Sequence, residues 1–321
     1  MKKILFVVFS LIISLGIFSL ASCGSKKTNI VSTSYAGYDL AKSVAGDLKT
    51  SSMLLKPGEE LHDYSPSVGD IEKIINSEIF IYIGGESDEV WVEKQILPEI
   101  NKEKTKVINM VELVKNSGKV YDEELPESGV AEEADEGEEE HELDEHVWNS
   151  ITNAKLIVNE ISKLLCEIDS NNQKTYKDNC NNTISKLDEI DNKIKNVISE
   201  GNKNLLIFAD RFPLLYFVKE YNLAYDAAFK GCETAKEANP RTIEKLTKKI
   251  LDNNIKVLFV IELSESNIAN TIITNCKNEG HDVTKRVFYT MHNVSKDDYN
   301  NGITYIDFMN KNIESLKEAL K

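Results

Sequence analysis

Histidine is rare in this sequence, and three of its five copies lie where separate segments could place them around one metal ion. His62, His146 and His292 each fall at a junction between a predicted strand and a predicted helix. Neutral imidazole is a borderline-soft donor that suits zinc, copper, nickel and iron. Three imidazoles can hold zinc at about 2.0–2.1 Å in a near-tetrahedral site. A single histidine of this kind would more simply be a surface or capping residue. The hypothesis of a metal site therefore depends on all three histidines lying on the same side of the molecule, at the ends of the strands.

The elements that must position these histidines follow an alternating pattern. Short apolar runs alternate with amphipathic stretches over residues 30–110 and again from residue 205 onward, which is typical of parallel sheets flanked by helices. Between them, residues 171–200 carry apolar residues at three- and four-residue steps, which predicts one long helix of roughly 45 Å. We therefore expect an α/β protein of two lobes, each with a mostly parallel four-stranded sheet. The long rigid helix joins the lobes, and the metal site lies in the cleft between them, beyond the carboxyl ends of the strands.

The N-terminus has the pattern of an export signal. Two lysines precede an almost wholly apolar stretch, and the residues "LASC" that follow resemble a bacterial lipobox ending at Cys23. We expect residues 1–22 to be a lipoprotein signal peptide, although a plain membrane anchor has a similar length. A lipid on Cys23 would tether the protein to the outer face of the bacterial cytoplasmic membrane. The predicted domains are then residues 23–170, the linking helix 171–200 and residues 201–321.

An acidic segment interrupts the first lobe. Residues 122–145 contain fourteen Asp or Glu residues and no Lys or Arg, a self-repelling composition that predicts a mobile loop. The formal net charge of the whole chain is −15, which argues against nucleic acid as a partner and otherwise favours solubility. No pair of cysteines has the spacing of a zinc knuckle. Cys232 and Cys276 could form a disulfide in an exported protein or pack as free thiols.

Several motifs resemble those of the zinc- or manganese-binding receptors of bacterial metal ABC importers, over nearly all of the mature chain. The most specific are "PGEELHDYSPSVGDIEKI", "GGESDEVWVEK", "DEHVWNSITNAKLIV" and "MHNVSKDDYNNGITYIDFMNKN". The resemblance implies metal ligands at His62 and His146, a monomer, Zn²⁺ or alternatively Mn²⁺ as cargo, and a membrane permease as partner. In zinc-specific members a mobile acidic loop precedes the second ligand. The resemblance therefore implies that this loop captures metal ions, through the residues His141, Glu138, Glu139, Glu140 and Glu142.

The second lobe departs from the family pattern. Where the resemblance places a ligand, this chain has Arg211, which stays protonated and cannot bind a metal. The last ligand position falls near His292, and Asp210 is expected as the fourth ligand. Glu233, Glu262 or water are alternatives. Glu262 could instead orient a ligand histidine without binding the metal itself.

The resemblance implies a receptor rather than an enzyme. Its function would be to capture zinc outside the membrane and deliver it to an ABC importer permease. Manganese or iron as the cargo is the nearest alternative. An adhesin or structural lipoprotein of the same fold and an exported zinc hydrolase remain as alternatives of other classes.

Overall fold

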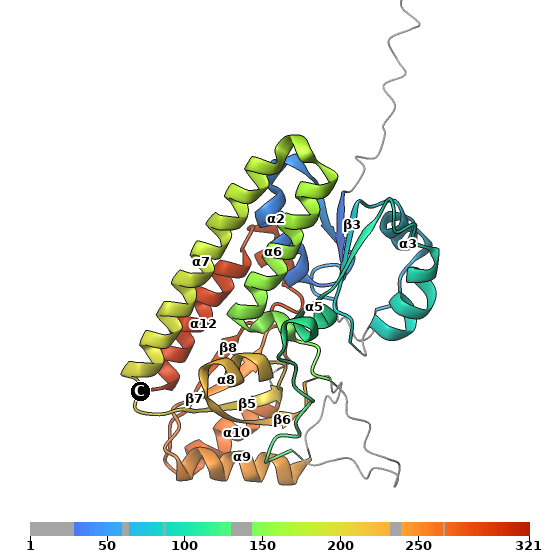
Figure 1. The fold of residues 1–321 in the computed structure, drawn as a ribbon. Coiled ribbons are helices and arrows are strands. Elements are labelled where there is room, and N and C mark those ends of the chain that lie inside the picture. The colour runs from blue at the N-terminus through green and yellow to red at the C-terminus, as the bar shows by residue number, and fades with distance from the viewer. Residues whose placement is uncertain (1–28, 60–63, 86–87, 130–142, 232–238, 266) are drawn as a thin grey trace, which may run out of the picture.

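The computed structural model describes residues 29–59, 64–85, 88–129, 143–231, 239–265 and 267–321. Two four-stranded sheets, both fully parallel, have the strand orders β2-β1-β3-β4 and β6-β5-β7-β8 (Figure 1). The strands are β1 (Ile30–Ser32), β2 (Ser51–Met53), β3 (Ile79–Tyr82), β4 (Lys106–Asn109), β5 (Leu205–Arg211), β6 (Ala224–Phe229), β7 (Val257–Ile261) and β8 (Thr284–Phe288). The expected α/β fold with two lobes is confirmed.

Helices flank both sheets and connect them. The α-helices are α2 (Tyr35–Ala45), α3 (Val68–Ile75), α5 (Met110–Ser117), α6 (Ile151–Ile168), α7 (Gln173–Glu200), α8 (Leu215–Tyr221), α9 (Pro240–Asp252), α10 (Asn267–Asn278), α11 (Lys296–Asn300) and α12 (Tyr305–Ala319). The sequence predicts an ordinary helix in the stretch that begins at Asp88. The chain instead forms a π-helical segment, Glu89–Ile96, followed by a 3-10 turn, Leu97–Glu99.

The long helix α7 belongs to the packing of both lobes. It has 28 residues, or about 42 Å, and contacts α2 and α6 of the first lobe and α12 of the second (Figure 1). Leu187, Ile190 and Ile194 on its apolar face are buried in one large core that also contains residues of both sheets. This shared core makes the helix a structural brace between the lobes.

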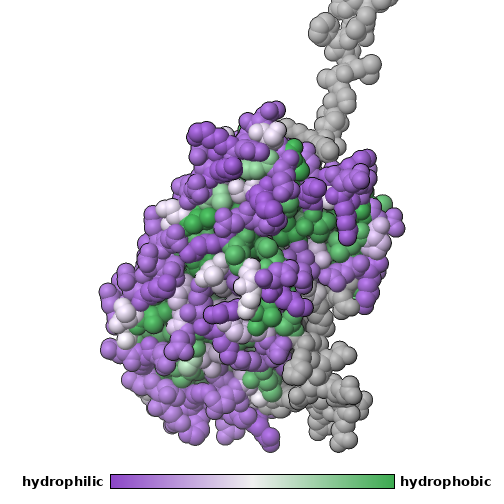
Figure 2. Space-filling view, viewed as in Figure 1, coloured by the Kyte–Doolittle hydropathy of each residue, from purple (hydrophilic) through white to green (hydrophobic). Residues whose placement is uncertain are grey.

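The sheets separate this central core from two smaller outer cores. The pleat of β3 sends Ile79 and Ile81 into the central core and Phe80 and Tyr82 into the outer core of the first lobe. In the second lobe, Cys276 lies in the outer core as a buried free thiol, while Cys232 lies outside the described residues. The face drawn in Figure 2 is mainly hydrophilic, with apolar residues in scattered patches.

The two ends of the acidic segment are packed rather than free. Asp122 and Leu143 form an antiparallel bridge, so the chain leaves and returns at one point. Ser128 is buried and donates to the Asp226 carboxylate of β6 from its backbone N, at 2.9 Å, and from Oγ, at 2.6 Å. The expectation that the whole segment is a mobile loop without buried residues therefore does not hold at its ends. Residues 130–142 lie outside the described residues.

The N-terminal signal and Cys23 also lie outside the described residues. Within the part of the chain that the structure describes, no helix combines the length and the apolar character needed to cross a membrane.

Candidate metal centre

His146 is fully buried just before α6 and has one ring nitrogen committed to a carboxylate. Asp144 Oδ1 accepts a hydrogen bond from the His146 backbone N at 2.8 Å and lies 3.2 Å from ring Nδ1. A carboxylate accepts only, so Nδ1 carries the proton and Nε2 keeps its lone pair. Nε2 is buried and has no hydrogen-bond partner among the described residues. An imidazole oriented in this way is prepared to bind a cation through Nε2.

The protonation of His146 responds to opposing influences. Burial disfavours the charged imidazolium and would lower the pKa of His146, but the nearby carboxylates of Asp144 and Glu145 outweigh burial. The pKa of His146 is therefore raised above its ordinary value. The same carboxylates that stabilise a proton on the ring would stabilise a metal cation at Nε2.

His292 lies in the turn after β8, and this turn is held from both lobes. Glu262, which follows β7, accepts hydrogen bonds from Thr290 N and Thr290 Oγ1, both at 2.7 Å. Trp148 Nε1 from the first lobe donates to Thr290 O at 2.8 Å, and Tyr35 N at the start of α2 donates to His292 O at 3.2 Å. These contacts fix the backbone that carries the imidazole of His292.

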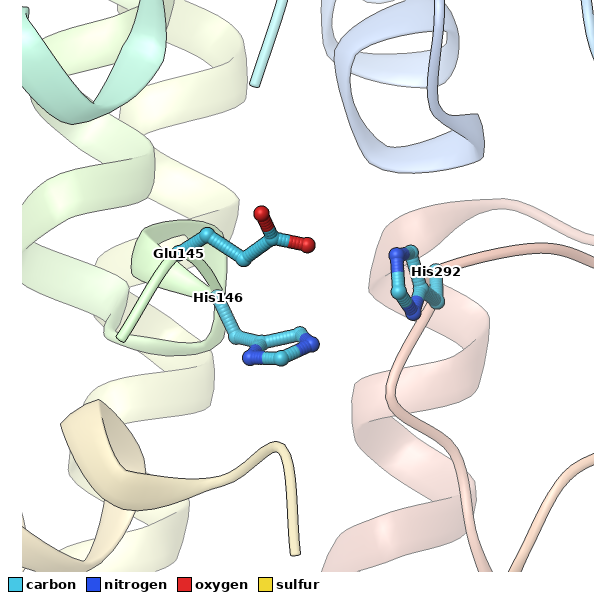
Figure 3. Close-up of side chains that lie close together, drawn as sticks. All are labelled: Glu145, His146 and His292. Carbon is cyan, nitrogen blue, oxygen red and sulfur yellow. The ribbon is translucent and has the colours of Figure 1, made fainter. Parts of the chain in front are cut away.

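Glu145, His146 and His292 come together where the lobes meet (Figure 3). All three are buried, and one ligand atom from each lies within 4.8 Å of the others. The two imidazole rings are 5.0 Å apart and nearly perpendicular, and the Trp148 ring lies 5.5 Å from each. In a tetrahedral zinc site neighbouring ligand atoms are about 3.3 Å apart, so small side-chain rotations would close this cluster around an ion.

The conformation at His146 explains why two adjacent side chains point the same way. Consecutive residues of an extended chain point to opposite sides. Here Val147 N donates to Glu145 O at 2.9 Å, and His146 has φ −84° and ψ 45°, which is an inverse γ-turn. Figure 3 shows both side chains directed toward His292. Sequence reasoning missed Glu145 because this turn cannot be distinguished within a run of acids.

The other expected ligands of the second lobe are committed elsewhere. Asp210 Oδ1 accepts from Arg211 N at 2.9 Å, and its Oδ2 accepts from Ile261 N at 3.4 Å. Burial raises the pKa of Asp210 and of Glu262 above the ordinary values, although their hydrogen bonds act in the opposite direction. Neither residue belongs to the donor cluster found among the described residues. Glu262 instead holds the turn that carries His292.

Several predicted site residues lie outside the described residues and are not placed: His62, His141, Glu138, Glu139, Glu140, Glu142, Glu233 and Cys23. The segment that leads to His62 is nevertheless attached to the turn of His292. Asn293 Nδ2 donates to Lys56 O at 3.1 Å and to Glu59 O, and Gly58 N donates to Val294 O at 2.8 Å.

The base of the acidic segment also reaches this centre. A Cβ built at Gly231 would lie 3.1 Å from Glu123 Oε1 and 3.3 Å from His146 Cε1. Glu123, at the start of the segment, is therefore close to the buried histidine. The carboxylate-rich segment begins and ends beside the donor cluster.

These features define the class of protein. Two parallel α/β lobes, braced by one long helix and contributing facing nitrogen and oxygen donors, form a two-lobed solute-binding protein with a transition-metal type of donor set.

The comparison with known proteins gives the family. Residues 30–319 match the family described as "ZnuA: Zinc-uptake complex component A periplasmic", and the chain belongs to this family. It is 30% identical to the "Zinc-binding lipoprotein AdcA" of Streptococcus pneumoniae over 99% of this chain, and it spans 61% of that relative's length. It is 28% identical to the "High-affinity zinc uptake system protein ZnuA" of Bacillus subtilis, covering 94% of this chain and 93% of the relative.

A solved structure agrees with this assignment. The Zn(II)-bound ZnuA-like domain of Streptococcus pneumoniae AdcA superposes with a TM-score of 0.70 at 26% identity, covering 92% of this chain and 99% of that one.

Proposed function

We propose that this protein is an extracytoplasmic receptor that captures Zn²⁺ and delivers it to the permease of an ABC importer. The observation that carries the proposal is the buried meeting of His146 and His292 from different lobes, with the Nε2 of His146 left without a hydrogen-bond partner among the described residues. A buried imidazole nitrogen of this kind is costly unless a cation or a donor fills the space in front of it. The names of the relatives described above support zinc as that cation.

His62 is proposed as the third imidazole. The described residues that precede it, Lys56 to Glu59, lie against the turn of His292, because Lys56 O and Glu59 O accept hydrogen bonds from Asn293. Three imidazoles favour zinc over manganese, because manganese prefers a larger share of oxygen ligands. Manganese or iron remains the alternative cargo.

The remaining parts of the proposal concern location and delivery. The lipid on Cys23 would hold the receptor, as a monomer, at the outer face of the cytoplasmic membrane. The acidic segment, with His141 and its neighbouring glutamates, would gather cations through carboxylates that exchange quickly. Glu123 at the base of that segment provides a carboxylate beside His146 to which a captured ion could pass. Because α7 braces both lobes, release would involve local rearrangement rather than a wide hinge motion.

Trp148 offers a direct assay of binding. Its ring lies 5.5 Å from both imidazoles, whereas the only other tryptophan, Trp91, lies in the outer core of the first lobe. In a Trp91→Phe background, zinc should change the fluorescence of Trp148 with a one-to-one endpoint. Competition with manganese under the same conditions should leave zinc bound. No fluorescence or calorimetric response to zinc, or displacement of zinc by equimolar manganese, would contradict the proposal.

Histidine variants with a matched control locate the site. His62→Ala, His146→Ala and His292→Ala should each weaken zinc binding by about 100-fold or more, whereas His141→Ala should mainly slow capture. His281→Gln is the control, because His281 Nε2 lies against Ile255 O at 2.7 Å, away from the cluster. Full zinc affinity in His292→Ala would show that the proposed ligand set is wrong.

The transport role has a separate test in cells. Deletion of the gene should impair growth under zinc limitation, and added zinc should restore it. An adhesin or an exported zinc hydrolase would not give zinc-specific rescue.

A further inference from the structure

We propose that Glu145 is the carboxylate ligand of the bound metal, in the coordination place that Arg211 cannot fill. The inference rests on the proposed function as a metal receptor, and it assigns the oxygen donor that the sequence left open among Asp210, Glu233, Glu262 and water.

The geometry separates Glu145 from the described alternatives. A carboxylate oxygen of Glu145 lies within 4.8 Å of ligand nitrogens on both His146 and His292. The oxygens of Asp210 accept backbone N–H groups, and both oxygens of Glu262 accept from Thr290. Those acids have structural tasks, whereas the Glu145 carboxylate is directed at the two imidazoles (Figure 3).

Close packing behind Glu145 keeps it in this position. Gly85, after β3, approaches so closely that a Cβ there would lie 2.3 Å from Glu145 Oε2 and 2.4 Å from Glu145 Cβ. Such distances are not tolerated between real atoms, so only glycine fits at residue 85. With 1% of its surface exposed, Glu145 has little room to turn toward solvent.

A second carboxylate is buried near Glu145. Asp88 is fully buried, and the charge of Glu145 acts on it. Two buried carboxylates repel each other, and a divalent ion held by Glu145 would lessen that repulsion.

The test compares Glu145→Gln with Asp210→Asn in the full mature chain. Zinc affinity is measured by competition with a chelator, and the melting temperature is measured with and without zinc. Glu145→Gln should lower zinc affinity by about 100-fold and shrink the zinc-induced rise in melting temperature, while Asp210→Asn should stay within about threefold of wild type. The melting temperatures without zinc show how much of any change is independent of the metal.

A second variant reports coordination directly. Glu145→Cys loaded with Co²⁺ should show a sulfur-to-cobalt charge-transfer band that the wild type lacks. Wild-type zinc affinity in Glu145→Gln would overturn the assignment. Loss of affinity in Asp210→Asn alone would transfer the role to Asp210. In each of these cases zinc binding by the wild type still supports the receptor function, whereas a wild type that binds no zinc would refute the function itself.

Discussion

Replacing Glu262 separates a residue that positions His292 from one that binds the metal. Its two oxygens accept hydrogen bonds of 2.7 Å from the backbone N and the hydroxyl of Thr290, two residues before His292. Glutamine has the same shape and can make both contacts, with its oxygen toward the N–H and its amide group toward the hydroxyl. Alanine can make neither. If Glu262 only holds the turn, Glu262→Gln should be tolerated and Glu262→Ala should not.

The size of the effect follows from the two hydrogen bonds that alanine cannot make. Thr290 is fully buried, so Glu262→Ala leaves two buried polar groups without their acceptor. Each such group costs about 1–3 kcal/mol, and removal of a buried carboxylate whose pKa is raised by burial offsets part of the loss. We expect a net decrease of about 3 kcal/mol in the free energy of unfolding, which lowers the melting temperature of a chain of this length by about 5 °C. Misplacement of His292 should weaken zinc binding by about 10- to 100-fold.

Urea unfolding of the metal-free protein and chelator competition for zinc measure the two effects separately. Thr290→Val is the companion variant, because it removes the hydroxyl but keeps the backbone N–H, and it should show roughly half of the loss of stability. The reasoning is refuted if Glu262→Gln loses zinc affinity as severely as Glu262→Ala. That result would make the negative charge itself essential and would indicate that Glu262 binds the metal.

Two further predictions concern pH and a partly buried ion pair of the second lobe. Because the pKa of His146 is raised, its proton competes with zinc at a higher pH than the proton of an ordinary histidine would. On acidification, zinc affinity should fall by up to about tenfold per pH unit for each proton that zinc displaces. A zinc affinity that stays constant from about pH 8 to about pH 5.5 would contradict a histidine site. Lys249→Met removes the ammonium group that lies 2.9 Å from the fully buried carboxylate of Asp226, while the hydrogen bonds from Ser128 remain. The free energy of unfolding, measured by urea titration, should fall by about 2 kcal/mol. The control Lys248→Met loses only an exposed pair and should change it by about 0.5 kcal/mol or less.

The sequence predicted the fold because the relevant signals are local. Apolar runs of strand length alternating with amphipathic stretches indicate parallel sheets, and the apolar face of α7 is visible as a three- and four-residue repeat. The π-helical segment after Asp88 was not predicted, because its hydrogen-bond pattern leaves no distinct signature in residue types.

The donor cluster was only partly predictable. The positions of His146 and His292 beside predicted strands and helices indicated a common rim, and the structure places their rings 5.0 Å apart. The sequence analysis expected Asp210 as the fourth ligand, with Glu262 among the alternatives, because an acid that binds a metal and an acid that accepts N–H groups look identical in a sequence. Only the positions of Ile261 N and Thr290 N distinguish these tasks.

The amino-acid sequence by itself determined two parallel α/β lobes, the long helix between them and the placement of His146 and His292 beside strand ends, because residue type and spacing encode these features locally. The tertiary structure alone decided that Glu145 faces His292, that Glu262 supports the turn of His292, and that the ends of the acidic segment are packed. Those outcomes depend on the γ-turn at His146, the close approach of Gly85 and hydrogen bonds between residues far apart in the chain. Side-chain direction at such places is set by contacts across the fold, which no local pattern records.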